Sequence, residues 1–389
     1  MSVEPGWEGV QEAFEGNFAS GEEVGAGCAV YHRGKLVVDL VGGHFDGAKT
    51  QPYTDDALQL VFSTTKGVTA IAVEMCVDRG LIDYDEKVTT YWPEFAANGK
   101  GDATVAQLLS HQCGLISVDA PTSRAEALDW KTITARLAEG TPEWPIGTAH
   151  GYHALTYGWL AGELIRRTDG RTPGQFVAEE IAGPLGLDLW IGLPAEHESR
   201  VSPMLGSLAT KSDDPAVQAM IDQFFGPGSN AYRALYLNGA FEFEGQADNP
   251  FNTAEVHAAE IPAGNGIANA RSLAKLYAAT LGEVDGIQLL SEATRDRARL
   301  RVTPDGETDQ CLMLESTFGM GFMVHGPMTV YSGPGSYGHP GAGGSVAFAQ
   351  PERDLAFAYV MNQMATNLAG DMRAQRLLEA AAAAADAVG

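Results

Sequence analysis

The stretch Ser63-Thr64-Thr65-Lys66 lies where an apolar run, residues 58–62, passes into the helical stretch 67–77. Positions three apart in a helix share a face, so the Ser63 hydroxyl and the Lys66 ammonium can meet within one turn. Serine becomes a nucleophile only when another group takes its proton. A lysine takes that proton when burial lowers its pKa toward neutrality. The S-x-x-K pattern is typical of seryl acyl-transfer enzymes.

A second S-x-x-K, Ser272-Leu273-Ala274-Lys275, lies in a predicted amphipathic helix over residues 270–281. Its inward positions are apolar, and Ser272 falls near the helix start, where serine is a common cap. We interpret this pair as a helix cap and an exposed lysine. Ser63 is therefore the candidate nucleophile, and it needs partners elsewhere in the chain.

The composition limits the classes of protein to which this chain can belong. The chain has 389 residues, 45% of them hydrophobic, which is enough for a large core and two domains. The sequence contains no run of about twenty apolar residues, so no membrane span is expected. Its first residues lack the pattern of a secretory signal. The four cysteines, Cys28, Cys76, Cys113 and Cys311, are scattered and are expected to be buried free thiols. We expect a cytoplasmic enzyme.

The formal net charge is −25, from 50 acidic and 25 basic residues, and no block of lysine and arginine interrupts it. Nucleic acids and anionic membranes are poor partners for such a surface. A small-molecule substrate is the expected partner.

Both chain ends carry hairpin patterns. Residues 27–31 and 36–40 flank a glycine turn, and residues 346–349 and 355–360 flank a second turn. Helical spacing over 7–18 predicts an N-terminal helix, and the alanine-rich tail predicts another over 368–387. Further helices are expected over residues 105–109, 132–137, 154–168, 175–185 and 270–281.

Strands at both ends with helices between them predict an α+β fold in which the chain ends form one antiparallel sheet. The expected domains are a discontinuous sheet domain, residues 1–60 and 310–389, and an inserted, mainly helical domain, residues 61–309. The site is expected in the cleft between them. Residues 201–264 are rich in glycine and aromatic residues and are expected to be loop-rich. This segment is either the wall or lid of a pocket or an ordinary packed excursion.

Three other stretches have features of a site. Tyr152 precedes a predicted helix and can point its hydroxyl into a cleft. The alternative is that Tyr152 is a half-buried aromatic residue with a structural role. The glycines of 338–344 imply close backbone approach and N–H donors, or a tight connection. Residues 108–115 end a helix at a glycine and are expected to be structural.

Other chemistries find no support in the sequence. There is no G-x-S-x-G nucleophile elbow and no phosphate-binding loop. His150 and His153 have helical spacing, but no carboxylate or cysteine cluster accompanies them, so we expect no metal site.

Taken in order along the chain, Ser63-Thr64-Thr65-Lys66, Tyr152-His153-Ala154 and His339-Pro340-Gly341 resemble the motifs of the serine β-lactamase and penicillin-binding-protein superfamily. Within it, the chain is most similar to the class C β-lactamase-like carboxylesterases, or family VIII esterases. The resemblance covers nearly the whole chain and implies a β-lactamase-like fold.

The resemblance also implies roles. Ser63 would be the nucleophile, and Lys66 with Tyr152 the proton-transfer pair, with either of the two as the base. His339 and Gly341 would line the cleft on an edge strand, and the N–H groups of Ser63 and Ala342 would form the oxyanion hole. The resemblance requires no metal or organic cofactor.

Two departures from the β-lactamase pattern bear on the substrate. Y-x-N ends here in Ala154, which lacks the amide, and K-T-G becomes H-P-G, in which His339 replaces a permanent cation. β-Lactams and D-Ala-D-Ala peptides carry a carboxylate that this cation would help to hold. We therefore expect a carboxylesterase acting on uncharged esters of short to medium acyl chains.

Alternatives on the same fold are a β-lactamase, a D-amino-acid amidase or peptidase, and an acyltransferase. A non-catalytic binding protein is a further alternative.

Overall fold

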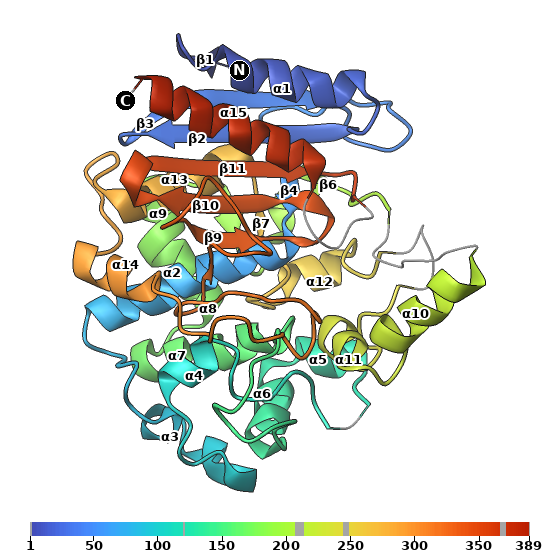
Figure 1. Ribbon diagram of the computed structural model, residues 1–389, viewed down its shortest axis with the longest axis vertical. Coiled ribbons are helices and arrows are strands. Elements are labelled where there is room, and N and C mark those ends of the chain that lie inside the picture. The colour runs from blue at the N-terminus through green and yellow to red at the C-terminus, as the bar shows by residue number, and fades with distance from the viewer. Residues whose placement is uncertain (1, 120, 207–213, 244–248, 366–370, 389) are drawn as a thin grey trace.

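The computed structural model describes residues 2–119, 121–206, 214–243, 249–365 and 371–388. At its centre is a seven-stranded antiparallel sheet of order β1-β3-β2-β11-β10-β9-β8 (Figure 1). Its strands are β1 (Ser2–Val3), β2 (Gly25–His32), β3 (Lys35–Gly43), β8 (Met323–Val324), β9 (Tyr337–Pro340), β10 (Val346–Gln350) and β11 (Leu355–Met361).

The two chain ends meet in the middle of this sheet. β2 pairs with β11, with Cys28 opposite Tyr359, while the β2–β3 and β10–β11 hairpins lie on either side. Every residue of β2 and of β11 is buried, because helices cover both faces of the sheet. The expected antiparallel sheet made by both chain ends is confirmed, and with it the α+β class.

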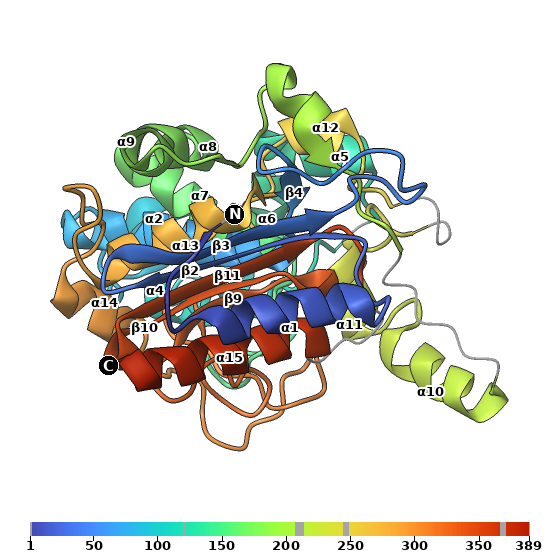
Figure 2. The same cartoon turned by 90° about the horizontal axis from the view of Figure 1, so that it is seen from above.

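Helices from both ends of the chain cover one face of the sheet. α1 (Glu8–Ala19) and α15 (Met372–Val388) lie side by side there, and α13 (Ala270–Leu281) packs on the opposite face (Figure 2). α1 places Val10 and Phe14 in the core, as its helical spacing predicts. α15 begins at Met372, later than the expected 368, and residues 366–370 of that prediction lie outside the described residues.

Helices fill most of the middle of the chain. They are α2 (Thr65–Asp78), α3 (Val88–Tyr91), α4 (Val105–Leu109), α5 (Arg124–Leu128), α6 (Trp130–Glu139), α7 (Thr156–Asp169), α8 (Pro173–Phe176), α9 (Gly183–Leu185) and α14 (Glu292–Ala298). The helix expected over 175–185 is a composite, because a π-helical stretch, Val177–Ala182, connects α8 to α9. α7 ends where Gly170 adopts φ +94°, a left-handed cap.

A second sheet was not expected from the sequence. Its order is β5-β7-β4-β6, with β4 (Leu58–Leu60), β5 (Leu189–Trp190), β6 (Val201–Ser202) and β7 (Ile267–Ala268). The Val61 N–H donates to Gly266 O at 2.9 Å, which extends the β4–β7 contact by one residue. This small sheet therefore fixes the direction in which the chain enters the Ser63 turn.

The segment 201–264, which was expected to be loop-rich, also has regular secondary structure. It contains β6 and three helices, α10 (Pro215–Phe225), α11 (Asn230–Tyr236) and α12 (Ala254–Ala258), while residues 207–213 and 244–248 lie outside the described residues. α10 projects from the body of the molecule (Figures 1 and 2). Asp214 and Pro215 supply a helix start that the aromatic and glycine content obscured, since the Ala216 N–H donates to the Asp214 carboxylate.

Within the described ranges no helix combines the length and apolar character needed to cross a bilayer. The four cysteines are free and buried.

Candidate active site

Ser63 lies in a tight turn between β4 and α2. The preceding residue, Phe62, has φ +44°, a left-handed conformation that costs energy in a residue with a side chain. Its ring is buried edge-on against Phe251, with 5.2 Å between ring centroids, and Thr65 Oγ1 donates to its carbonyl at 2.5 Å. These contacts hold the strained residue in place. The turn leaves Ser63 half-buried just before the N-terminal end of α2.

Lys66 is enclosed at the base of this turn. Its side chain has no exposed surface, and Nζ lies 3.1 Å from Ser63 Oγ. Nζ also donates to two backbone carbonyls, Ala154 O at 2.6 Å and Ala263 O at 2.9 Å. Burial holds the Lys66 pKa well below its ordinary value, because no carboxylate is placed to compensate the ammonium charge among the described ion pairs.

Tyr152 packs against both residues. Lys66 Nζ lies 4.7 Å from the centroid of the Tyr152 ring, and the phenol shares a side-chain hydrogen bond with Ser63. Burial raises the Tyr152 pKa above its ordinary value, and the charge of Asp309 adds to that increase. The hydrogen bond to Ser63 opposes it. The phenol is thus protonated next to the serine hydroxyl.

His339 lies behind Tyr152 on β9. The two rings stack with centroids 5.8 Å apart, and Nδ1 donates to Pro340 O at 2.7 Å. Nε2 is buried with no hydrogen-bond partner in the described parts of the chain. Burial lowers the His339 pKa to about 3, and the charge of Lys66 acts in the same direction. His339 is therefore a neutral imidazole at pH 7.

Gly341 and Ala342 bring the end of β9 against the Ser63 turn. A Cβ on Gly341 would lie 2.3 Å from Val61 O and 2.2 Å from Ser345 Oγ, so only glycine allows this approach. Ala342 then begins a second short helical turn, Ala342–Gly344. The first N–H groups of a helical turn have no partner inside it. Ser63 and Ala342 both occupy such positions in neighbouring turns.

The histidines near Tyr152 have structural partners. The His153 ring accepts from the Leu115 N–H at 3.0 Å and donates to Gly151 O at 2.6 Å. The His150 ring contacts Ser316 Oγ at 3.1 Å and the Glu307 carboxylate at 3.3 Å. The described residues contain no group of three or more potential metal ligands.

The second S-x-x-K has a different geometry. Asn269, and not Ser272 as expected, caps α13, and Ser272 Oγ instead accepts from the Asp188 N–H at 2.9 Å. Lys275 is only partly exposed, since Nζ donates to Leu185 O and pairs with Asp285, both at 2.7 Å. Serine and lysine face different partners here.

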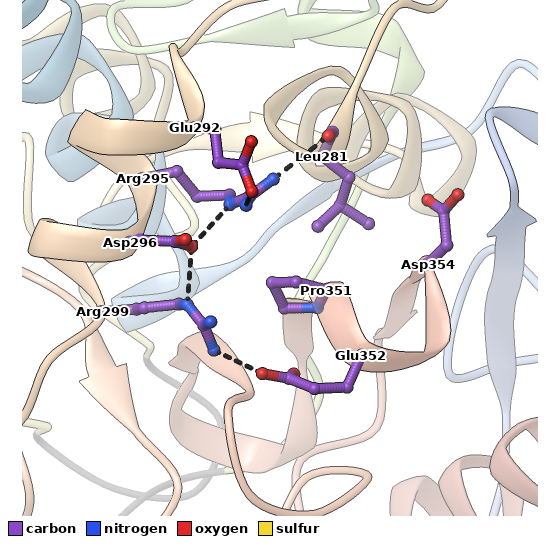
Figure 3. A pocket seen from close by; sticks show the side chains of 8 residues that line it. All are labelled: Leu281, Glu292, Arg295, Asp296, Arg299, Pro351, Glu352 and Asp354. Carbon is purple, nitrogen blue, oxygen red and sulfur yellow. Dashed lines mark hydrogen bonds and ion pairs between the residues drawn. The ribbon is translucent and has the colours of Figure 1, made fainter.

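A polar pocket lies away from Ser63, between α14 and the β10–β11 turn (Figure 3). Arg295 and Arg299 share the Asp296 carboxylate, and Arg299 continues to Glu352 at 2.8 Å. Each guanidinium is satisfied by protein groups, so this ion-pair chain joins the helix to the sheet. None of the predicted site residues lines it.

Comparison with known proteins identifies the family. The sequence profile of the Beta-lactamase family matches residues 10–382. The chain belongs to the Beta-lactamase family. Esterase/beta-lactamase LipL from Mycobacterium tuberculosis is 36% identical over 377 residues, which cover 94% of this chain and 83% of LipL.

Solved structures of the family are similar over nearly the whole chain. A penicillin-binding protein homologue from Caulobacter crescentus has 41% identity and a TM-score of 0.88, covering 99% of both chains. A family VIII carboxylesterase has 37% identity and a TM-score of 0.86, again covering 99% of both chains. The expected β-lactamase-like fold and the resemblance drawn from the three motifs are confirmed.

Sequence analysis missed three residues that hold the site together. Ala263 supplies a carbonyl to Lys66, Ser345 lies against the Ser63 turn, and the Asp309 carboxylate accepts from the Tyr152 N–H at 3.0 Å. Ala263 contributes only its backbone carbonyl to the first contact, so its side chain gives no signal. Ser345 follows the glycine-rich stretch directly, which is the one signal that would have drawn attention to it.

Proposed function

We propose that this protein is a carboxylesterase that hydrolyses small, uncharged carboxylic esters through an acyl-enzyme on Ser63. The observation that carries the proposal is the 3.1 Å contact between Ser63 Oγ and the Nζ of a fully buried Lys66. Support from relatives comes from LipL, which is named an esterase, and from the family VIII carboxylesterase at 37% identity.

The contacts of Lys66 allow a neutral Nζ to act as the base. A neutral amine has two N–H donors and one lone pair, whereas an ammonium has three donors and no acceptor. The carbonyls of Ala154 and Ala263 use two donors, so the lone pair of a neutral Nζ faces Ser63 Oγ. The lowered pKa of Lys66, caused by burial, favours that neutral form over the ammonium.

Tyr152 would complete the proton path. As Ser63 Oγ bonds to the ester carbonyl carbon, its proton passes to Lys66 Nζ. When the C–O bond to the leaving group breaks, the alkoxide takes the phenol proton of Tyr152, and the Lys66 ammonium replaces it. Water then attacks the acyl-enzyme by the same route, which releases the acid and frees Ser63. The raised pKa of Tyr152 suits a proton donor better than a resting phenolate.

The oxyanion would bind between the N–H groups of Ser63 and Ala342. Preorganised N–H donors of this kind account for about 3–4 kcal/mol of transition-state stabilisation each in acyl transfer. Their turns lie together because Gly341 permits contact with Val61.

The charge of the site favours neutral substrates. His339 is uncharged at pH 7 because its pKa is about 3, and Ala154 offers Lys66 a carbonyl but no side-chain amide. A substrate carboxylate would find an uncharged imidazole at His339 in place of a permanent cation. Aliphatic esters of short to medium chain carry no such group.

The test is release of p-nitrophenol from acetyl, butyryl and octanoyl esters. We expect Ser63→Ala to lose about 10⁴-fold or more in kcat and Tyr152→Phe about 10²-fold or more. Ser272→Ala is the matched control, because its S-x-x-K lacks a serine–lysine contact, and it should retain wild-type turnover.

Near-normal ester hydrolysis by Ser63→Ala would overturn the proposal. Faster turnover of matched p-nitroanilides than of esters would favour an amidase or peptidase instead. A product carrying an added alcohol or amine acceptor would identify an acyltransferase.

A further inference from the structure

Asp309 is a fully buried carboxylate close to the candidate active site. Its side chain has no exposed surface, and no arginine, lysine or histidine forms an ion pair with it within the ranges that the structure covers. Three backbone N–H groups donate to Oδ1: Tyr152 at 3.0 Å, Cys311 at 2.8 Å and Leu312 at 2.9 Å. Ser316 Oγ donates to Oδ2 at 2.6 Å. Four donors thus hold this one carboxylate in place.

We propose that Asp309 is a positioning residue, which fixes the backbone at Tyr152 and through it the place of the phenol. This inference rests on the proposed function, because it assigns Asp309 a part in the proton transfer by Tyr152. Asp309 itself touches neither Ser63 nor Lys66 in any described contact, so it acts only through Tyr152.

The backbone around Tyr152 needs such a support. Residues 149–153 belong to no helix or strand, so no regular pattern of hydrogen bonds fixes them. Three successive N–H groups are held by only two residues. Gly151 donates to His111 O at 3.1 Å, Tyr152 to Asp309 Oδ1 at 3.0 Å, and His153 to His111 Nδ1 at 3.0 Å. Asp309 accepts from the middle of these three N–H groups, which belongs to Tyr152, the residue that carries the phenol.

The loop that contains Asp309 is itself braced. The Asp309 N–H donates to Leu314 O and its carbonyl accepts from the Met313 N–H, both at 2.9 Å. Ser316 connects the carboxylate to the His150 ring at 3.1 Å, and the His150 ring contacts Glu307. The Asp309 carboxylate therefore has little freedom to move with Tyr152. The backbone of Tyr152 is held in place by its hydrogen bond to Asp309.

A fixed position for the phenol matters because burial favours its protonated form. Burial lowers the pKa of Lys66, His111, His153 and His339, which all face the phenol or its turn. Asp309 raises the pKa of Tyr152 and so opposes its ionisation. A phenol that stays protonated is ready to give its proton to the leaving alkoxide.

The experiment compares Asp309→Ala with Asp309→Asn on p-nitrophenyl butyrate. In Asp309→Asn the amide oxygen accepts the three backbone N–H groups, and Nδ2 donates to Ser316 Oγ in place of the lost acceptor. Asp309→Ala leaves the three backbone N–H groups without this acceptor, while Ser316 Oγ keeps its contact with the His150 ring. We expect Asp309→Ala to lower kcat by about 30-fold or more with KM changed less than about threefold, since misplacing a catalytic group by about 1 Å costs about 10²-fold.

Asp309→Asn is expected to recover kcat to within about fivefold of wild type, because it restores the position of Tyr152. Asp78→Ala is the matched control. Asp78 accepts from Ser291 N, Ser291 Oγ and Thr294 Oγ1 at 2.6–2.8 Å at the far end of α2, so its loss should lower thermal stability without lowering kcat.

The proposal is overturned if Asp309→Ala keeps wild-type kcat, or if its loss of kcat is no larger than that of Asp78→Ala. It is also overturned if Asp309→Asn is as impaired as Asp309→Ala. Should Asp309→Ala fail to fold, Asp309→Asn decides alone, with kcat within about fivefold of wild type and unchanged fluorophosphonate labelling expected. Activity retained by Ser63→Ala would instead refute the proposed function, whatever the Asp309 variants do.

Discussion

Ser345 Oγ lies 3.1 Å from Thr64 Oγ1, although 281 residues separate them in the chain. The same hydroxyl donates to Val61 O at 2.8 Å, and Ser345 O accepts from the Gly341 N–H at 2.6 Å. One serine thus joins the turn that carries Ser63 to the turn that begins at Ala342. The two N–H groups proposed for the oxyanion hole belong to those turns, so their separation depends on this contact.

Ser345→Ala is expected to weaken both stability and catalysis. Removing the hydroxyl takes away one of two donors to Val61 O, since the Thr64 N–H remains at 3.1 Å, and it also removes the contact with Thr64 Oγ1. The loss should lower the free energy of unfolding by about 0.5–1.5 kcal/mol. Because the two oxyanion donors then move apart, kcat on p-nitrophenyl butyrate should fall by about 10-fold or more. Urea unfolding and steady-state kinetics measure the two effects.

Ser202→Ala is the control for Ser345→Ala. Ser202 Oγ is also buried and donates to a backbone carbonyl, Phe45 O, at 2.6 Å. Its loss should lower stability and leave kcat unchanged. If Ser202→Ala lowers kcat as much as Ser345→Ala does, the effect on catalysis is general and the contact with Thr64 has no special part in it.

The sequence predicted those parts of the fold that local patterns determine. The two hairpins follow from apolar strands on either side of short turns, and the Ser63–Lys66 contact follows from helical spacing alone. The strands of the small sheet have only two or three residues, too few for any periodic pattern. They form because neighbouring segments supply partners, which a single sequence does not reveal.

In the site, too, local patterns predict some contacts, while contacts between distant segments leave no local signal. Proximity of Tyr152 to Lys66 was expected from resemblance, because nothing in the residues around Tyr152 points to a segment 86 positions earlier. The contacts of Ala263 O and Asp309 join a backbone group to a distant side chain and leave no mark in composition or spacing. The left-handed Phe62 is equally hidden, since residues with side chains rarely adopt that conformation.

Lys66→Met tests whether Lys66 is neutral in the folded protein. The pKa of Lys66 is lowered on folding, so between that lowered value and 10.5 the unfolded chain binds one proton more than the native protein. Stability then rises with pH. The free energy of unfolding of wild type minus that of Lys66→Met should increase by about 1.4 kcal/mol per pH unit within this window.

Urea unfolding at about pH 8 and about pH 9 measures this slope for Lys66→Met. Lys275→Met is the comparison, because its ammonium pairs with Asp285 at 2.7 Å outside the site and its loss gives the background slope of a lysine substitution. A slope for Lys66→Met no steeper than this background would mean that the buried Lys66 keeps its proton, which contradicts its assignment as the base.

Substrate charge should decide turnover. We compare the p-nitrophenyl monoester of succinic acid, which carries a free carboxylate, with its methyl-capped form, which has similar size and no charge. His339 is neutral because its pKa is about 3, and the chain carries a net charge of −25. The capped ester should have the higher kcat/KM by about 10-fold or more. Equal or faster turnover of the free acid would show that an unassigned cation binds the carboxylate.

Gly67 is a glycine because α2 and α13 lie close together at this point. A Cβ on Gly67 would lie 1.9 Å from the hydroxyl of Tyr277, which is buried and has no hydrogen-bond partner among the residues described. Gly67→Ala should therefore cost about 1–3 kcal/mol of stability through overpacking, although alanine is the better helix former. Tyr277→Phe alone should be close to neutral, since it removes an unpaired hydroxyl.

The double variant Gly67→Ala/Tyr277→Phe separates this clash from a general intolerance of side chains at position 67. Removing the hydroxyl frees the space that the new methyl group needs, so the double variant should recover about 0.5–3 kcal/mol relative to the sum of the single changes. Urea unfolding of the four proteins gives the coupling energy directly. Additive effects would mean that Tyr277 moves aside without cost, and that His339 Cβ, 3.7 Å from the same point, or the backbone of α2 excludes the methyl group instead.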